Sequence, residues 1–122
     1  MSRFVILHHE MPPDGKRSSH WDFMLQWEDV LKTWALDERP ETGKTTAATA
    51  LDDHRTAYLD YEGPISDDRG SVTRWDAGTY RLVRQSEEEW VIDLAGNRLT
   101  GRVTLVRASD GERRWLFTLA AD

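Results

Sequence analysis

The chain has 122 residues, of which 31% are charged and 39% hydrophobic, and its formal net charge is −6. This size and composition predict one soluble domain over residues 1–122, and the acidic charge argues against a broad basic surface that binds nucleic-acid phosphates. The absence of cysteine excludes disulfides, thiolate metal sites and cysteine nucleophiles. No apolar run is long enough for a membrane span or a signal peptide, so we expect a cytoplasmic protein.

The first half of the chain predicts four strands. Residues 3–9 contain the apolar run Phe4-Val5-Ile6-Leu7, residues 20–27 alternate between apolar and polar, and residues 30–36 follow a tight reversal. Residues 45–51 contain alanines that favour helix and threonines that favour strand, and we interpret them as a strand. Residues 52–59 are expected to form a helical turn or a tight loop.

The second half predicts short strands separated by turn residues. Ala77-Gly78 is one such turn, and Ala95-Gly96-Asn97 is another. The strands are expected at residues 71–76, 79–84, 89–94, 99–107 and 113–120. Many short strands at this spacing are typical of an antiparallel sandwich or barrel.

The strand at residues 20–27 has two different faces. One face starts with His20 and Asp22, which lie one pleat repeat apart, about 6.5–7 Å along a strand. Their side chains can converge on one metal ion, and His9, at the end of the preceding apolar run, is the candidate third ligand. The other face is committed to the core by Trp21, Phe23, Leu25 and Trp27.

Two imidazoles and one carboxylate form a metal site with open coordination positions. Such a site suits manganese, zinc or iron better than calcium, and its metal can polarise a phosphoryl oxygen or activate water. His54 would act as a general acid or stabilise developing charge, and Tyr58 would be a hydrogen-bond donor. By itself, however, a His-x-Asp spacing more often marks a hydrogen-bonded surface pair. His8 should face away from His9, and we interpret all six tryptophans as core residues.

Several sequence blocks form one pattern in chain order over nearly all of the 122 residues. The blocks are Phe4-Val5-Ile6-x-x-His9, His20-Trp21-Asp22-Phe23-x-Leu25, Val30-Leu31-Lys32-Thr33-Trp34-Ala35, Asp53-His54-x-x-x-Tyr58-x-Asp60-Tyr61-Glu62-Gly63, Trp75-Asp76-x-Gly78-Thr79-Tyr80, Leu99-x-Gly101, Leu105-Val106-Arg107 and Trp115-Leu116. This pattern resembles the 3′-phosphoesterase domain of bacterial DNA ligase D.

The resemblance implies a mainly β protein, a compact antiparallel β-barrel with short helical segments and a metal site in a crescent-shaped groove. It implies metal-dependent repair of 3′ ends in bacterial end joining: removal of a 3′-terminal ribonucleoside, then of a 3′-phosphate, from the primer strand of a primer–template. The implied ion is manganese, with zinc as the alternative. The metal ligands fall on His9, His20 and Asp22, and the second active-site histidine and the tyrosine fall on His54 and Tyr58.

The chain departs from the family where the family binds phosphate. Met24 and Thr46 stand in place of two phosphate-contacting arginines, and Glu38 stands in place of a lysine. The segment Ser66-Asp67-Asp68-Arg69-Gly70 replaces a glycine-rich loop, and only three residues precede the first strand, where the family has an extension. The loop between His9 and His20 is also longer than usual.

Three interpretations follow. The chain is still a 3′-end phosphoesterase, with replacement cations from Lys16, Arg17 or Arg55; it is a hydrolase on another phosphorylated substrate; or it is a metal-binding or structural barrel that acts as an interaction module. Because the domain stands alone in this sequence, we expect any ligase or polymerase partner to act in trans.

Overall fold

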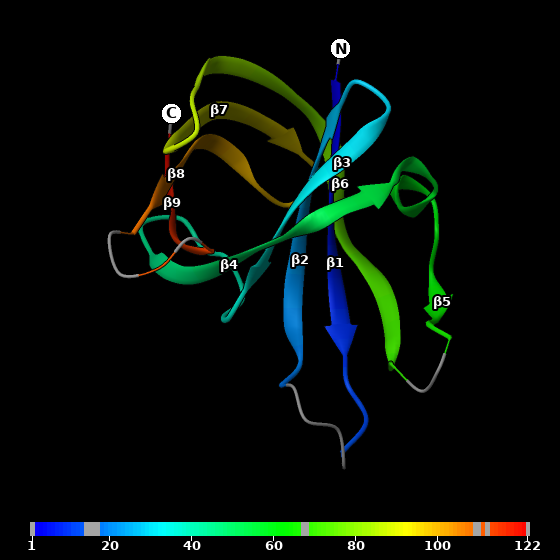
Figure 1. The fold of residues 1–122 in the computed structure, drawn as a ribbon. Coiled ribbons are helices and arrows are strands. Elements are labelled where there is room, and N and C mark those ends of the chain that lie inside the picture. Colours follow the sequence, from blue (N-terminus) through cyan, green and yellow to red (C-terminus); the bar gives the residue numbers. More distant parts are fainter. Residues whose placement is uncertain (1, 14–17, 67–68, 109–110, 112, 122) are drawn as a thin grey trace.

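The computed structural model describes residues 2–13, 18–66, 69–108, 111 and 113–121 (Figure 1). Strand makes up 68% of the chain and helix 4%, which confirms a mainly β protein. The elements are β1 (Ser2–Glu10), β2 (His20–Trp27), β3 (Val30–Leu36), β4 (Thr45–Arg55), η1 (Thr56–Leu59), β5 (Gly63–Pro64), β6 (Ser71–Gln85), β7 (Glu89–Gly96), β8 (Thr100–Arg107) and β9 (Arg114–Ala120). No helix in this described part of the chain is long and apolar enough to cross a membrane.

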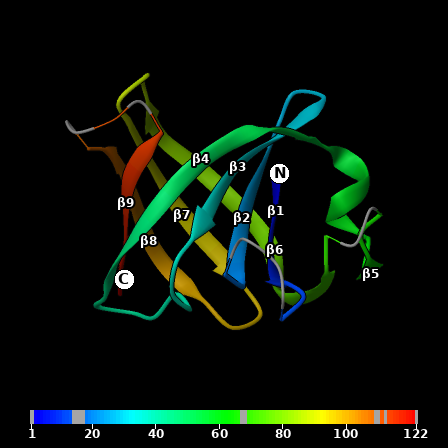
Figure 2. The same cartoon turned by 60° about the horizontal axis from the view of Figure 1, so that its bottom comes forward.

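The strands form one antiparallel sheet that closes on itself. Their order is β1-β2-β3-β4-β9-β8-β7-β6-β5, and β1 also pairs with β6. This pairing closes eight strands into a barrel and leaves β5 outside it, attached to β6 (Figures 1 and 2). The predicted compact antiparallel barrel with a short helical segment is therefore confirmed.

The long strand β6 corrects one prediction. Ala77-Gly78 is not a turn, because β6 continues through it from Ser71 to Gln85. Gly78 pairs with Phe4 of β1 on one side and with Gly96 of β7 on the other. A Cβ atom at Gly78 would lie 2.1 Å from the carbonyl oxygen of Ala95, so close backbone approach explains this glycine.

The segment after residue 51 also differs from its prediction. Residues 45–51 form a strand as predicted, but β4 continues to Arg55 and the helical part is limited to η1. Across a register shift between Leu31 and Thr33, β4 stays paired with β3 as far as Arg55, with His54 opposite Leu31. His54 therefore lies near the end of a strand and Tyr58 in the short helix that follows it.

The barrel interior is filled by large aromatic and aliphatic side chains. Trp34 packs edge-on against Trp90, with ring centroids 5.6 Å apart, and against Trp115 at 5.7 Å. These three tryptophans are buried, and the other three pack against the same cluster, as predicted: Trp21, Trp27 and Trp75. The interior core therefore uses the apolar face of β2.

A second apolar cluster lies on the opposite face of β1 and β2. It contains Val5 and Leu7 of β1, Met24 of β2 and Leu59 of η1. Tyr58 packs against it from the outside. Because both faces of β1 and β2 are covered, these strands are held rigidly, and the candidate site continues this outer face.

Candidate metal centre

Pairing of β1 with β2 brings the three predicted metal ligands together. His9 lies opposite His20, and Leu7 lies opposite Asp22. Since residues two apart on a strand share a face, His9, His20 and Asp22 project from the same side of the sheet. Each offers a ligand atom, and these atoms all lie within 4.8 Å of one another.

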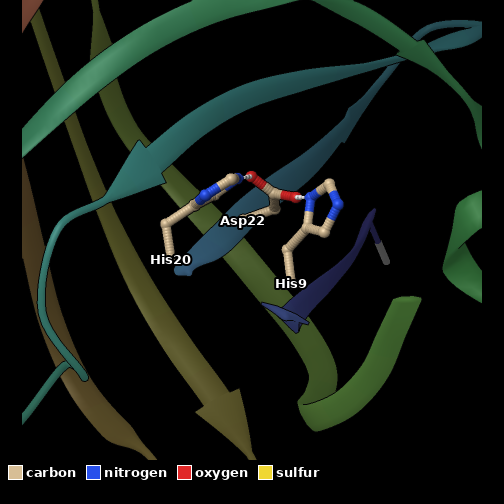
Figure 3. A group of neighbouring side chains, drawn as sticks. All are labelled: His9, His20 and Asp22. Atoms are coloured by element: carbon tan, nitrogen blue, oxygen red, sulfur yellow. Dashed lines mark hydrogen bonds and ion pairs between the residues drawn. The ribbon is translucent and has the colours of Figure 1, made fainter. Parts of the chain in front are cut away.

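The carboxylate of Asp22 lies between the two imidazoles (Figure 3). Its Oδ2 is 3.2 Å from Nδ1 of His9, and its Oδ1 is 3.1 Å from Nε2 of His20. Asp22 is 3% exposed and His20 5%. The group is thus withdrawn from bulk water, where polar atoms need partners within the protein.

Backbone carbonyls set the orientation of both imidazoles. Nδ1 of His20 lies 3.0 Å from the carbonyl oxygen of Ser18, and Nε2 of His9 lies 2.6 Å from that of Arg69. A carbonyl can only accept, so these nitrogens donate. In the neutral rings, the nitrogens that face Asp22 then carry lone pairs, as metal-binding histidines do.

The facing atoms of Asp22 and His20 fit a cation. Oδ1 of Asp22 and Nε2 of His20 are buried without a hydrogen-bond partner among the described residues, although they are only 3.1 Å apart. Burial raises the pKa of Asp22, but hydrogen bonds and positive charge from the His20 and His9 rings in their protonated form lower it more, to about 2, so the carboxylate is ionised whether or not these rings carry a second proton. An ionised carboxylate that faces two imidazole lone pairs is a donor set for a divalent transition metal.

The three residues lie in a cleft of about 380 Å³. Its lining also includes His54 and Tyr58, so the structure brings together all five residues proposed for catalysis and metal binding. The remaining lining residues are Leu7, Met11, Met24, Leu51, Asp52, Ile65, Arg69, Val72 and Arg113.

His54 is held in a defined orientation in this cleft. Its Nδ1 donates to the carbonyl oxygen of Asp52 over 2.8 Å, and its ring packs edge-on against Tyr58 with centroids 5.6 Å apart. Tyr58 in turn packs edge-on against Tyr61 at 5.9 Å. The hydrogen bond to Asp52 leaves Nε2 as the nitrogen of His54 that can exchange a proton with a substrate.

The predicted replacement cations are not the arginines that line the cleft. Lys16 and Arg17 lie outside the described residues, and Arg55 lines a neighbouring cavity of about 310 Å³. Arg69 and Arg113 line the cleft instead, and the sequence interpretation missed both. Arg69 carried a signal, because it lies in the segment that replaces the family's glycine-rich loop. Arg113 carried none, since only pairing of β4 with β9 brings it near Asp52.

The three positions where the family has basic residues contribute no positive charge here. Met24 is buried and lines the cleft, and Thr46 is buried on β4. Glu38 is ion-paired with Lys44 over 3.1 Å. Any positive charge for an anionic ligand must therefore come from other positions.

Comparisons of the sequence with known proteins point to one protein family. The sequence-family model of the DNA Ligase D 3′-phosphoesterase domain matches residues 12–107. The multifunctional non-homologous end joining DNA repair protein LigD of Mycobacterium tuberculosis is 33% identical over an alignment 122 residues long, which covers 93% of this chain and 15% of that protein. The multifunctional non-homologous end joining protein LigD of Pseudomonas aeruginosa is 30% identical over an alignment 115 residues long, which covers 84% of this chain and 14% of that protein.

This chain therefore spans about 15% of the length of the curated relatives it matches. The family match includes His20, Asp22, His54 and Tyr58 but begins after His9, which reaches the site through its pairing with His20. With a match over most of its length, the chain belongs to the DNA ligase D 3′-phosphoesterase domain family.

Proposed function

We propose that this chain is a metal-dependent phosphoesterase that processes DNA 3′ ends, removing a 3′-terminal ribonucleoside or a 3′-phosphate from a primer strand. Its biological role would be DNA repair by non-homologous end joining, the process for which the relatives are named. A ligase or polymerase would act on the ends that it releases.

One observation carries this proposal: a buried carboxylate faces two imidazole nitrogens whose rings are oriented by backbone carbonyls. Without a cation, ionised Asp22 would face the lone pairs of both neutral rings at about hydrogen-bonding distance. A bound divalent ion converts this repulsion into coordination. His9, His20 and Asp22 are therefore the residues that would hold the metal.

Manganese is the proposed ion. Imidazole and carboxylate ligands suit manganese, and the few protein ligands leave positions open for a phosphate oxygen and water. In this place the ion would act as a Lewis acid that polarises a phosphoryl oxygen of the 3′ end.

His54 and Tyr58 would act on the substrate rather than on the metal. Because Nδ1–H of His54 donates to the carbonyl of Asp52, a doubly protonated His54 would give the proton on Nε2 to the leaving oxygen as water attacks the phosphorus. The ring of Tyr58 packs on His54 and restrains it. The hydroxyl of Tyr58 would donate a hydrogen bond to the phosphoryl group.

The test combines product analysis with metal binding. One labelled primer–template carries a single 3′-terminal ribonucleotide and another a 3′-phosphate, each incubated with Mn²⁺ and wild type, His20→Ala or Asp22→Asn. We expect the wild type to release the ribonucleoside and the phosphate and both variants to lose turnover. Mn²⁺ titration followed by electron paramagnetic resonance should show one tight site in the wild type only.

The outcomes separate the alternatives. Tight Mn²⁺ binding without turnover of either DNA would replace the DNA end by another phosphorylated substrate. A wild type that neither binds Mn²⁺ nor turns over would contradict an enzyme and leave a structural barrel or interaction module. Asp22→Asn preserves side-chain volume and serves as the check if His20→Ala does not fold.

A further inference from the structure

We propose that Arg69 and Arg113 form a phosphate clamp across the cleft that binds the terminal phosphoryl group of the DNA 3′ end beside the metal centre. This inference rests on the proposed function and deepens it. Both residues line the same cleft as His9, His20 and Asp22. They would supply the positive charge that Met24 and Thr46 do not.

Arg69 is held next to the metal centre by its own backbone. Its carbonyl oxygen accepts the 2.6 Å hydrogen bond from Nε2 of His9. The next residue, Gly70, has φ +85°, and a Cβ there would lie 2.0 Å from the carbonyl oxygen of Glu10. A glycine is therefore needed for this loop to pack against the end of β1, and that packing keeps Arg69 beside His9.

The guanidinium of Arg69 is partly oriented and still has donors to spare. Its Nε donates to the carbonyl oxygen of Ser66 over 2.9 Å, and its Nη2 donates to the Ser66 hydroxyl over 3.2 Å. An arginine has five N–H donors in a fixed plane, so these two bonds, the side-chain bonds of Arg69 to described residues, leave three for a ligand. A guanidinium of this kind can bind two phosphate oxygens at once.

Arg113 reaches the cleft from the other side. It precedes β9, and β9 and β5 lie on opposite sides of β1 and β2 (Figures 1 and 2). Its Nη1 donates to the carbonyl oxygen of Ala50 over 3.0 Å, and its Nη2 donates to Oδ1 of Asp52 over 3.0 Å. These bonds fix the guanidinium on β4, close to His54.

The charges of the cleft favour an anion only when a metal is bound. Arg69 and Arg113 balance Asp22 and Asp52, the two acidic residues among the lining residues. A divalent ion adds two positive charges, so a phosphoryl dianion would restore neutrality. This arrangement explains how a chain with net charge −6 could bind a DNA end locally.

Replacing Asp52, the ion-pair partner of Arg113, should change phosphate binding in the direction opposite to replacing either arginine. Its ion pair with Arg113 is solvent-exposed, with side-chain exposures of 58% for Arg113 and 91% for Asp52. Such pairs are weak, so a phosphate can displace the carboxylate from the guanidinium. Replacing Asp52 by asparagine should free Arg113 and remove a repulsive charge.

The experiment measures DNA binding by fluorescence anisotropy, with Mn²⁺ and in a His54→Ala background that suppresses turnover. The probes are two primer–templates of identical sequence, one ending in a 3′-phosphate and one in a 3′-hydroxyl. Arg69→Ala and Arg113→Ala are compared with Arg81→Ala. Arg81 is a suitable control because it is exposed, pairs with Asp93 and is not one of the cleft lining residues.

We expect Arg69→Ala and Arg113→Ala each to weaken binding of the 3′-phosphate probe roughly tenfold. Each should lower the salt dependence of that binding by about 0.7–0.9 in log–log slope, the value for one phosphate contact. The 3′-hydroxyl probe should be much less affected, Arg81→Ala should match the parent, and Asp52→Asn should bind the 3′-phosphate probe more tightly. Equal affinities of the arginine variants and Arg81→Ala for the 3′-phosphate probe would overturn the clamp.

Mn²⁺ titration of each variant separates the clamp from the proposed function. If the wild type binds Mn²⁺ and processes 3′ ends while the arginine variants bind DNA normally, only the clamp is wrong. If the wild type neither binds Mn²⁺ nor processes ends, the proposed function itself is wrong. Loss of Mn²⁺ binding in Arg69→Ala would show that this residue acts through His9 and would overturn its direct part in the clamp.

Discussion

At the scale of single residues, His54 and the metal-centre histidines share one arrangement with different consequences. Each ring donates one N–H to a backbone carbonyl: His20 to that of Ser18, His54 to that of Asp52 and His9 to that of Arg69. In His9 and His20 the other nitrogen faces the buried carboxylate of Asp22. His54 has no carboxylate on its other side among its described contacts, which suits a residue that exchanges protons with a substrate.

His54→Ala should therefore reduce kcat by about 10²–10⁴-fold, the usual effect of losing a general acid, with little change in Mn²⁺ affinity. His8→Ala is the matched control, because His8 stacks on Trp21 with ring centroids 4.6 Å apart, on the face opposite His9. Turnover in His54→Ala equal to that in His8→Ala would remove His54 from the chemistry.

Asp22 predicts how the stability of the metal-free protein depends on pH. Its folded-state pKa of about 2 lies below the ordinary value of 3.8. The unfolded chain therefore binds more protons than the folded chain between these two pH values. The stabilising contribution of Asp22 to the folded state is complete above pH 3.8 and is lost as the pH falls toward 2. This lowering of the pKa corresponds to a contribution of about 2–3 kcal/mol to the free energy of unfolding.

Denaturant unfolding in the presence of a chelator, from pH 2 to 5, measures this contribution. The free energy of unfolding should rise with pH more steeply in the wild type than in Asp22→Asn, which has no carboxyl to titrate. Parallel curves for the two proteins would mean that the imidazoles do not stabilise the charge of Asp22.

The clustering of the three candidate metal ligands could be predicted from sequence because the signals were local. His20 and Asp22 lie two apart on one strand, and His9 ends the strand before it. Arg69 and Arg113 could not be predicted in the same way. Their positions depend on a loop packed against Glu10 and on the pairing of β4 with β9, which are contacts between distant parts of the chain.

At the scale of elements, β6 closes the barrel and Asp76 holds it at the point where it passes from β1 to β7. The carboxylate of Asp76 is 3% exposed and accepts four backbone N–H groups. Oδ1 accepts from Ala77, Asn97 and Arg98, and Oδ2 accepts from Leu99. This one side chain therefore ties β6 to the turn between β7 and β8.

Asp76→Ala should lower the free energy of unfolding by about 2–4 kcal/mol, because it removes a buried acceptor shared by four N–H groups, of which that of Asn97 also donates to the carbonyl of Ala77. Asp53→Ala is the control, since it removes a carboxylate with an exposed partner, Lys32, at 3.2 Å. That loss should cost about 0–1 kcal/mol. Urea unfolding at neutral pH measures both, and similar losses would contradict the role given to Asp76.

The same strand shows where element prediction from sequence failed. Ala77-Gly78 has the composition of a turn, but Gly78 is required by the close approach of three strands within the barrel. Residues 52–55 likewise remain in β4, because His54 and Arg55 pair with β3 beyond a register shift. By contrast, β2 and β3 have the predicted bounds, since their alternation and the turn between them are local properties.

At the scale of the whole molecule, β1 and β2 serve both the barrel core and the metal centre. Their inward residues, such as Phe4 and Phe23, belong to the interior cluster, and their outward residues Leu7 and Met24 form the floor beside the metal centre. Ligand atoms on two paired strands are brought together only when the barrel is folded. Metal binding should therefore be coupled to global stability.

Mn²⁺ should raise the melting temperature of the whole barrel, because a ligand that binds only the folded state stabilises it by mass action. At a free concentration 100 times the Kd, the gain is about 2.7 kcal/mol, which corresponds to a shift on the order of 10 °C for a domain of this size. Chelation should reverse the shift, and Ca²⁺ should give less because imidazole is a poor calcium ligand.

Differential scanning fluorimetry of wild type, Asp22→Asn and His8→Ala, each with Mn²⁺, Ca²⁺ or a chelator, tests this coupling. His8→Ala should keep the Mn²⁺ shift and Asp22→Asn should lose it, although both variants keep the barrel interior intact. A shift that persists in Asp22→Asn would place the stabilising ion elsewhere on the surface. Because β1 and β2 link the site to the core, such a result would also remove the proposed connection between metal binding and folding.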